Sequence, residues 1–331
     1  MKFYMQIFGC LIVLLFNCTS HNNDNLTPYN IERFDIEFKQ SYYTRDTCRK
    51  NVFKKKYGNF IDIYCNGVLR MDIFPDSVFS SHKTALFFND TLISKIYADV
   101  AKKFQNMDDI AIEISKTQKK YKKEFPNHDF PDIYTHISAF NQSYIVGDNL
   151  ISIALDNFLD NDYPEYSNFF EPYEIKNKNR VYIVPGLIQV LLYTEFPQTI
   201  DNKTTLLDRI IYEGKILYAT QKLLPDTPSS IITGYDEEQT KWLENNESHM
   251  WKTILSKQHL FSTDQLLQHK YIDPAPFTAT FTPISPGRAG RWIGLQIVTR
   301  FMNKNRNISL EELFSEKHTS NEILKKSGYK G

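Results

Sequence analysis

Histidine is the side chain best suited to binding zinc and to moving protons near neutral pH, so its spacing is considered first. Beyond the N-terminal segment, no two histidines lie within five residues of each other. The H-x-x-x-H pattern, which places two zinc ligands on one helix face, is therefore absent. His249, His259 and His269 are spaced by about 2.8 helical turns, so they would point in different directions even on one helix. We expect surface or hydrogen-bonded core histidines, and we predict no metal and no cofactor.

Other familiar catalytic and binding motifs are also missing. The sequence contains no G-x-S-x-G nucleophile motif, no G-x-G-x-x-G pattern and no Walker loop. Acidic residues are so numerous that the sequence cannot single out an acid–base pair. The 39 Lys and Arg residues balance the 39 Asp and Glu residues, so no net positive charge is available to hold a nucleic acid. Nucleic-acid binding is therefore not expected.

Cys18 is the residue with the most specific predicted chemistry. Lys2 and an apolar run of roughly ten residues precede it, which is the length of a secretory signal and too short for a membrane-spanning helix. The segment Leu15–Cys18 resembles a loose lipobox of the Bacteroidetes kind, in which a peptidase cuts before a cysteine that receives a lipid. We predict a lipoprotein signal peptide over residues 1–17, a lipid on Cys18 and a polar tether over residues 18–30. An uncleaved anchor with a chance cysteine is the alternative.

Two cysteines, Cys48 and Cys65, remain in the predicted mature domain. Export would place them in an oxidising compartment, where a disulfide is chemically allowed. They flank two segments that the sequence pattern predicts to be neighbouring strands. The two readings are a disulfide between them or two separately buried thiols. Their spacing and neighbours suggest neither a metal site nor a catalytic thiol.

The elements that must position these residues follow from hydrophobic periodicity. Alternation of apolar and polar residues predicts strands over residues 31–40, 59–68, 133–140 and 150–155. The last two strands are predicted to be joined by a turn at residues 146–149. Apolar stripes and capping residues predict helices over residues 90–105, 108–124, 181–196, 205–224, from 236 onward and 286–301, followed by two short helices. No Pro/Gly/Ser-rich linker interrupts residues 31–331, which predicts one α+β domain with an early sheet and a helical C-terminal half.

Several segments of the C-terminal half are similar to a known family. The sequence resembles the gliding-motility lipoprotein GldB family of Bacteroidetes in the segments 137–162, 182–197, 205–225, 234–251, 271–277 and 285–298. That family in turn looks like a relative of gluzincin-type zinc peptidases. In those enzymes one helix carries H-E-x-x-H, and a later helix supplies a glutamate ligand from an E-G-x-A-like motif. The resemblance therefore implies a zincin-like fold.

The sequence departs from the peptidase pattern at the metal ligands. Glu213 and Gly214 stand where the glutamate motif would be, but the preceding segment 181–196 contains no histidine. A zinc ion needs about three protein ligands, and one glutamate cannot hold it. A carboxylate in an apolar helix is normally paired, and the candidate partners are Lys215, Arg288 and Arg291. An arginine is favoured because its fork can hold a carboxylate through two hydrogen bonds.

Two interpretations of Glu213 remain open at this point. The first is an internal salt bridge that closes an old cleft, and the second is a cleft that still binds a peptide or a partner. Trp292 and Trp242 are interpreted as core aromatic residues in preference to ligand platforms, and Trp292 is also a candidate residue of the cleft.

The family resemblance implies a non-enzymatic accessory lipoprotein of the gliding-motility or envelope secretion machinery. It would be held to a membrane of the cell envelope by the lipid on Cys18 and would contact other envelope proteins of that apparatus. The alternatives are an active envelope peptidase or hydrolase, and a peptide- or glycan-binding lipoprotein that uses the same cleft. The absence of H-E-x-x-H favours the first interpretation over the hydrolase.

Overall fold

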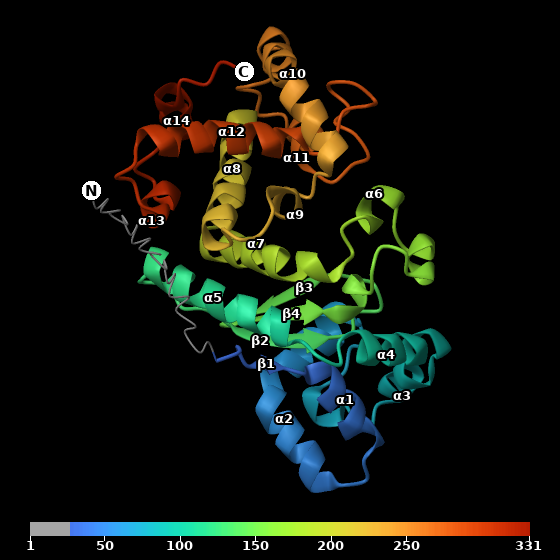
Figure 1. Cartoon of the computed structure of the whole chain (residues 1–331). Coiled ribbons are helices and arrows are strands. Elements are labelled where there is room, and N and C mark those ends of the chain that lie inside the picture. The colour runs from blue at the N-terminus through green and yellow to red at the C-terminus, as the bar shows by residue number, and fades with distance from the viewer. Residues whose placement is uncertain (1–26) are drawn as a thin grey trace, which may run out of the picture.

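A four-stranded mixed sheet lies near the middle of the molecule (Figure 1). The computed structural model describes residues 27–331. In the spatial order β1-β2-β4-β3, the strands are β1 (Ile31–Glu32), β2 (Asp132–His136), β4 (Leu150–Ala154) and β3 (Tyr144–Gly147). β2 pairs in parallel with both β1 and β4, whereas β3 pairs antiparallel with β4. β3 is therefore an edge strand.

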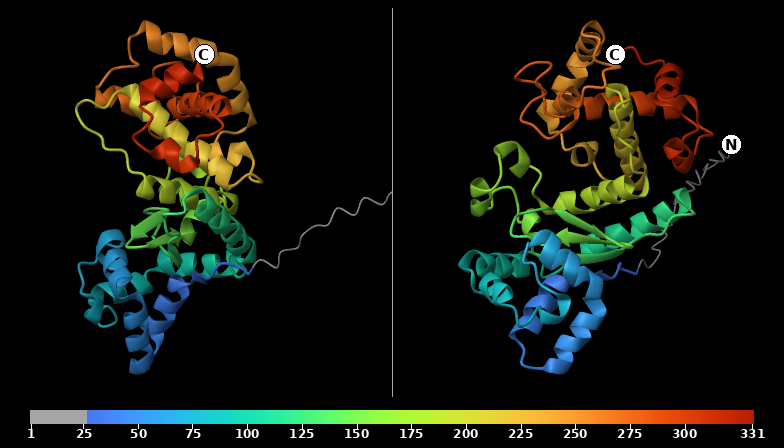
Figure 2. Two further views of the ribbon diagram at one scale, coloured as in Figure 1. Left: turned by 90° about the vertical axis from the view of Figure 1, so that its left-hand side faces the viewer. Right: turned by 180° about the vertical axis from the view of Figure 1, so that it is seen from behind.

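The helices of the first half gather around this sheet. They are α1 (Phe34–Tyr43), α2 (Thr47–Asp62), α3 (His82–Asn89), α4 (Thr91–Lys103) and α5 (Asp108–Glu124). Helices α1 to α4 lie on one side of the sheet, and α5 lies beside α7 on the other (Figures 1 and 2). α2 continues directly into a π-helix, Ile63–Val68. Short 3₁₀ turns occur at Pro75–Ser77, Leu155–Phe158, Pro164–Asn168 and Arg180–Tyr182.

The second half is helical. Its helices are α6 (Pro172–Ile175), α7 (Ile183–Glu195), α8 (Leu206–Leu223), α9 (Ser229–Thr233), α10 (Glu237–Ser256), α11 (Gln265–Ile272), α12 (Ala289–Lys304), α13 (Leu310–Phe314) and α14 (Ser320–Ser327). α7 packs on β3 and β4, and α8 leads from α7 up into the helical group around α12 (Figure 1). The predicted α+β class, with a small early sheet and a helical C-terminal half, is confirmed.

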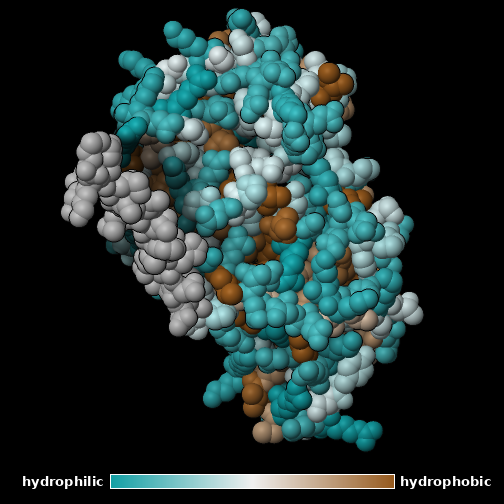
Figure 3. Space-filling view, viewed as in Figure 1, coloured by the Kyte–Doolittle hydropathy of each residue, from teal (hydrophilic) through white to brown (hydrophobic). Residues whose placement is uncertain are grey.

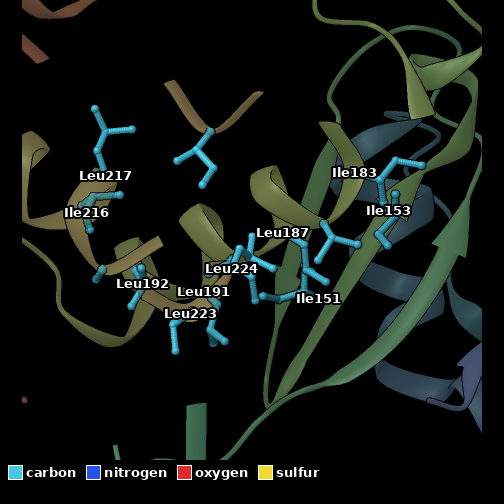
Figure 4. Packing of buried hydrophobic residues seen from close by; sticks show 14 of the residues in the cluster. Ile151, Ile153, Ile183, Leu187, Leu191, Leu192, Ile216, Leu217, Leu223 and Leu224 are labelled. Atoms are coloured by element: carbon cyan, nitrogen blue, oxygen red, sulfur yellow. The ribbon is translucent and has the colours of Figure 1, made fainter. Parts of the chain in front are cut away.

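α7 connects the sheet to the helical half through a continuous apolar core. Ile151 and Ile153 of β4 face Leu187 and Ile183 of α7 (Figure 4). The buried apolar side chains form one cluster that extends from Phe34 to Tyr329. Because α7 is apolar on most of its surface, it can be buried between the sheet and α8, as its sequence predicted.

Two of the predicted strands, residues 31–40 and 59–68, are wrong. Only Ile31–Glu32 is a strand, and the remainder belongs to α1, α2 and the π-helix that follows α2. The apolar residues there satisfy the helical spacing as well as the strand spacing, because aromatic rings recur four residues apart. Phe34 and Phe38 of α1 are fully buried and pack against rings of α2. Packing of this aromatic face decides in favour of the helix.

The prediction of the later strands is partly correct. β4 matches its predicted range, but β2 ends at His136 instead of residue 140. The turn at residues 146–149 was predicted to join β2 to β4, but it joins β4 to β3, a strand that was not predicted. β2 pairs with β4 in parallel. Ala139 and Phe140 adopt positive φ values of 55° and 64°, which ends the β2 extension.

Predicted helices that carry clear capping residues are confirmed. Asp90 caps α4, accepting a hydrogen bond from the Ile93 backbone N–H. Asp236 and Gln239 form the capping box that opens α10. Thr205 likewise caps α8. Side-chain caps satisfy backbone N–H groups that have no partner inside the helix, so they locate helix starts independently of tertiary packing.

Two glycines bring α8 and α12 into backbone contact. A Cβ on Gly294 would overlap the carbonyl oxygen of Ile210, and a Cβ on Gly214 would overlap the backbone of Gly294. Only glycine permits this approach. The close crossing places Glu213, beside Gly214, against Arg291, which lies nearly one turn before Gly294 on α12.

Candidate functional site

The site is a buried ion pair at the junction of α7, α8 and α12. The Nε atom of Arg291 donates a hydrogen bond to Oε2 of Glu213 over 2.6 Å. The two side chains are 5% and 8% exposed, so this is an internal pair and not a surface one. Glu213 is therefore paired with an arginine as expected, and that arginine is Arg291, but one hydrogen bond joins them where two were expected.

Two side chains of α7 complete the site. The Tyr193 hydroxyl donates to the same Glu213 oxygen over 2.6 Å. Nη2 of Arg291 donates to Oε1 of Gln189 over 2.9 Å, and Gln189 in turn donates to the carbonyl of Ile232. Gln189 and Tyr193 are four residues apart, so they lie on one face of α7. The guanidinium of Arg291 thus sits between polar groups that come from two other helices.

The charges of this site stabilise the ionised carboxylate. Burial alone would raise the pKa of Glu213, but the positive charge of Arg291 and the hydrogen bond from Tyr193 outweigh it, so the pKa is lowered. Arg288 contributes in the same direction. Burial raises the pKa of the Tyr193 phenol to about 12, although Arg291 opposes this shift. The pair is therefore ionised at neutral pH, with Tyr193 as a neutral donor.

The sequence analysis missed Gln189 and Tyr193. Their spacing of four residues on a predicted helix was visible, but nothing in the sequence showed that this face of α7 would meet Glu213 and Arg291. Within residues 27–331, no group of three or more His, Cys, Asp or Glu side chains is placed to hold a metal ion.

A family model described as "Gliding motility protein GldB" matches residues 19–331 of the chain. The chain belongs to the GldB family of gliding-motility lipoproteins. No curated protein and no solved structure matches it. The resemblance to gluzincin-type peptidases thus remains a prediction from the sequence.

The other two residues predicted as partners of Glu213 in this GldB-family protein, Arg288 and Lys215, do not join the ion pair. Arg288 begins α12, and its Nε donates to the carbonyl of Ile272 over 3.0 Å. Lys215 makes no ion pair within the described residues, and burial lowers its pKa to about 8. Neither residue is the partner of Glu213.

Trp292 follows Arg291 in the sequence but has no hydrogen bond to the ion pair within the described residues. It is 5% exposed and contributes to the core, as predicted. Its edge lines a surface hollow of about 620 Å³ between α9, α10 and α12. Trp292 therefore has a packing role.

The cysteine pair of this GldB-family protein does not form a disulfide. Cys48 and Cys65 are both free, the first exposed and the second buried. They lie near opposite ends of one continuous helical segment, roughly 25 Å apart at a rise of 1.5 Å per residue. A disulfide needs Cα atoms within about 7 Å, so these two cysteines cannot form one. The prediction that they flank two neighbouring strands was wrong because both residues belong to one helical segment.

The predicted signal peptide, the lipidated Cys18 and most of the predicted tether lie outside the described residues. Residues at the end of the predicted tether pack on α5, where the Ser115 hydroxyl donates to the carbonyl of Thr27 and the Tyr29 N–H donates to the carbonyl of Ala111. In the part of the chain from residue 27 onward, no helix combines the length and the apolar character needed to cross a bilayer.

Proposed function

We propose that this GldB-family protein is a non-enzymatic accessory lipoprotein of the gliding machinery, tethered to a membrane of the cell envelope and acting through contacts with other envelope proteins. The observation that carries the proposal is the Glu213–Arg291 pair. The family membership supplies the cellular process, and the ion pair supplies the argument against hydrolytic chemistry.

The polar site already contains a cation. If the predicted kinship with gluzincins is right, Gln189 and Tyr193 stand at the two histidine positions of H-E-x-x-H, and Glu213 stands at the later glutamate. Here the cation among these side chains is the guanidinium of Arg291, which is covalently part of α12. A metal ion would have to displace a hydrogen-bonded cation, and the two positive charges would repel each other. This favours a structural role for the site over catalysis.

The length of the predicted tether supports the membrane location. The family match begins at residue 19, directly after the predicted lipid-bearing cysteine. Eight residues lie between Cys18 and Thr27, and the nine Cα–Cα steps that join the two can span at most about 30 Å. A lipid on Cys18 would therefore hold the folded part close to the membrane surface, where other envelope proteins can reach it.

A variant that replaces both members of the ion pair and the Tyr193 hydroxyl together tests the proposal. We expect Glu213→Leu, Arg291→Met and Tyr193→Phe in combination to fold, because replacing a whole buried ion pair by apolar residues is often neutral or stabilising. The combined variant should restore gliding in cells that lack the protein, as well as the wild type does. The purified wild type should contain no stoichiometric zinc and should cleave no peptide.

Several results would contradict the non-enzymatic role. One is about one zinc per chain in elemental analysis. Another is a combined variant that folds and reaches the envelope but does not restore gliding. The contradiction would be complete if the wild type, and not this variant, cleaved peptides. Lys241→Met is a suitable control, because it breaks only an exposed pair with Glu237 and should leave gliding unchanged.

A further inference from the structure

The polar site contains more positive than negative charge. Arg288 and Arg291 lie close to Glu213, which is the single carboxylate of the group, and Glu213 is paired with Arg291. In the described residues, no carboxylate lies within ion-pair distance of Arg288. Burial and the neighbouring charge of Arg291 lower the pKa of Arg288. The lowered pKa shows that the positive charge of Arg288 is not fully compensated in the folded protein. The site therefore lacks one anion.

The backbone holds Arg288 in a fixed orientation. Its φ of 60° is in the left-handed region, which is unfavourable for a residue other than glycine and is typical of functional positions. The Tyr235 hydroxyl donates to its carbonyl over 2.8 Å, and its Nε donates to the carbonyl of Ile272. The two terminal amino groups make no hydrogen bond within residues 27–331. Arg288 is thus positioned with its outer donors free.

These donors border a cleft of about 370 Å³, which is within the size range of ligand sites. The loop after α6, the turn before α10 and the loop before α12 form its walls, which include Lys176, Tyr235 and Pro274. Its single acidic lining residue is Glu174, which accepts a hydrogen bond from the Glu171 backbone N–H. The lining contains two cationic side chains, Arg288 and Lys176, and one carboxylate. Lys176 already donates to Gln239 and lies near the charge of Asp236, so Arg288 is the cation best placed to receive an anion.

The strand order favours an extended peptide as the ligand. Ser143 lines the cleft and directly precedes β3, which is an edge strand with one side unpaired by the sheet. An extended segment leaving the cleft could continue along this edge through backbone hydrogen bonds. On the face seen in Figure 3, hydrophobic residues are scattered in small groups among hydrophilic ones, so recognition by charge is more suitable there than recognition by a broad apolar patch.

We infer that this cleft binds an extended peptide segment that carries a carboxylate, either a C-terminus or an acidic side chain, and that Arg288 receives that carboxylate. The inference rests on the proposed function, because it names the chemistry by which an accessory protein would recognise a partner. Arginine suits this role because its fork gives two parallel hydrogen bonds to a carboxylate.

The test uses the full-length protein in detergent and three mixtures of octapeptides that carry an uncharged BODIPY label, which has no carboxylate of its own. The randomised positions contain neither Asp nor Glu, and the three mixtures differ only in where a carboxylate is added. The first ends in a free carboxylate, the second ends in an amide and contains one Glu, and the third ends in an amide and has no acid. Fluorescence anisotropy should show at least tenfold tighter binding of the first or the second mixture than of the third.

Arg288→Gln should remove this preference, since glutamine keeps side-chain donors but not the charge. Arg306→Gln, at an exposed position without an ion pair, is the matched control and should bind like the wild type. If Arg288→Gln lowers the melting temperature strongly, Lys176→Glu provides a second test. It adds a negative charge to the cleft wall and should weaken the binding of the carboxylate peptides as much as Arg288→Gln does.

Three outcomes would overturn the inference. They are equal binding of all three mixtures, an unchanged preference in the Arg288→Gln protein, and competition by inorganic phosphate stronger than competition by carboxylate peptides. Failure of the proposed function would appear differently, as cleavage of the same peptides detected by mass spectrometry. The two failures can therefore be distinguished in one set of samples.

Discussion

Burying two charges costs solvation free energy, and the Glu213–Arg291 pair offsets that cost through several hydrogen bonds. Glu213 Oε2 accepts from both Arg291 and Tyr193, and Arg291 also donates to Gln189. At the residue scale, the pair is therefore a network in which each member depends on the others. Removing one member should cost more free energy than removing the whole charged group.

Arg291→Met alone is expected to lower the free energy of unfolding by about 3–5 kcal/mol, because it leaves the Glu213 carboxylate buried without a counter-charge. The combined Glu213→Leu, Tyr193→Phe and Arg291→Met variant should be close to the wild type. Urea unfolding of the purified proteins measures both. Lys241→Met, which breaks an exposed pair with Glu237, is the control and should have a much smaller effect.

The pH dependence provides an independent check of the same pair. Because the pKa of Glu213 is lowered in the folded protein from a reference value of 4.5, its stabilisation is present above that value. It is lost as the pH falls through the folded-state pKa. The stability difference between the wild type and Glu213→Gln should therefore shrink below about pH 4.5. A difference that stays constant from pH 7 to pH 3 would show that charge does not hold this site together.

At the element scale, prediction from sequence succeeded where a local interaction determines the structure. Asp90, Thr205 and the Asp236 capping box mark helix starts through hydrogen bonds to their own neighbouring backbone. Prediction failed for α1 and α2, where the apolar spacing of aromatic residues fits both a strand and a helix, and only packing between the two helices decides. The pairing of β2 with β4 is also a long-range property that no local pattern encodes.

The candidate site was likewise predictable where local chemistry determines it, and not where long-range packing does. Glu213 and the arginine type of its partner followed from the chemistry of a carboxylate in an apolar helix. The choice of Arg291 over Arg288 did not, because it depends on the crossing of α8 and α12. That crossing depends on Gly214 and Gly294, whose close approach appears only in three dimensions.

Gly294→Ala is accordingly expected to destabilise the protein by about 1–3 kcal/mol or more, because its Cβ would overlap the Ile210 carbonyl and force the two helices apart. Gly58→Ala is the matched control. A Cβ there, within α2, meets no atom within 4 Å, and alanine should stabilise the helix by up to about 1 kcal/mol. Thermal and urea unfolding of both variants give the comparison. Equal stability of Gly294→Ala and the wild type would mean that α8 and α12 do not touch.

At the scale of the whole molecule, the folded part and the N-terminal segment have different functions. The folded part presents the charged cleft, and the N-terminal segment is predicted to fix its distance from a membrane. Each buried methylene group of a lipid chain contributes about 0.8 kcal/mol to membrane binding, so a lipid on Cys18 can hold a polar domain that has no membrane-spanning helix in its described residues. The described contacts of Thr27 and Tyr29 show that the segment arrives at the folded part along α5.

Cys18→Ser should therefore abolish attachment. We expect the wild type to sediment with the membrane fraction and to incorporate an alkyne-labelled palmitate. The Cys18→Ser protein should incorporate none, and it should be either soluble or retained as an uncleaved precursor of higher mass. Cys10→Ser is the control, because Cys10 lies in the predicted signal segment and should be removed with it. Normal maturation, label incorporation and sedimentation of Cys18→Ser would contradict the lipid anchor, and the membrane association would then have to come from the folded part itself.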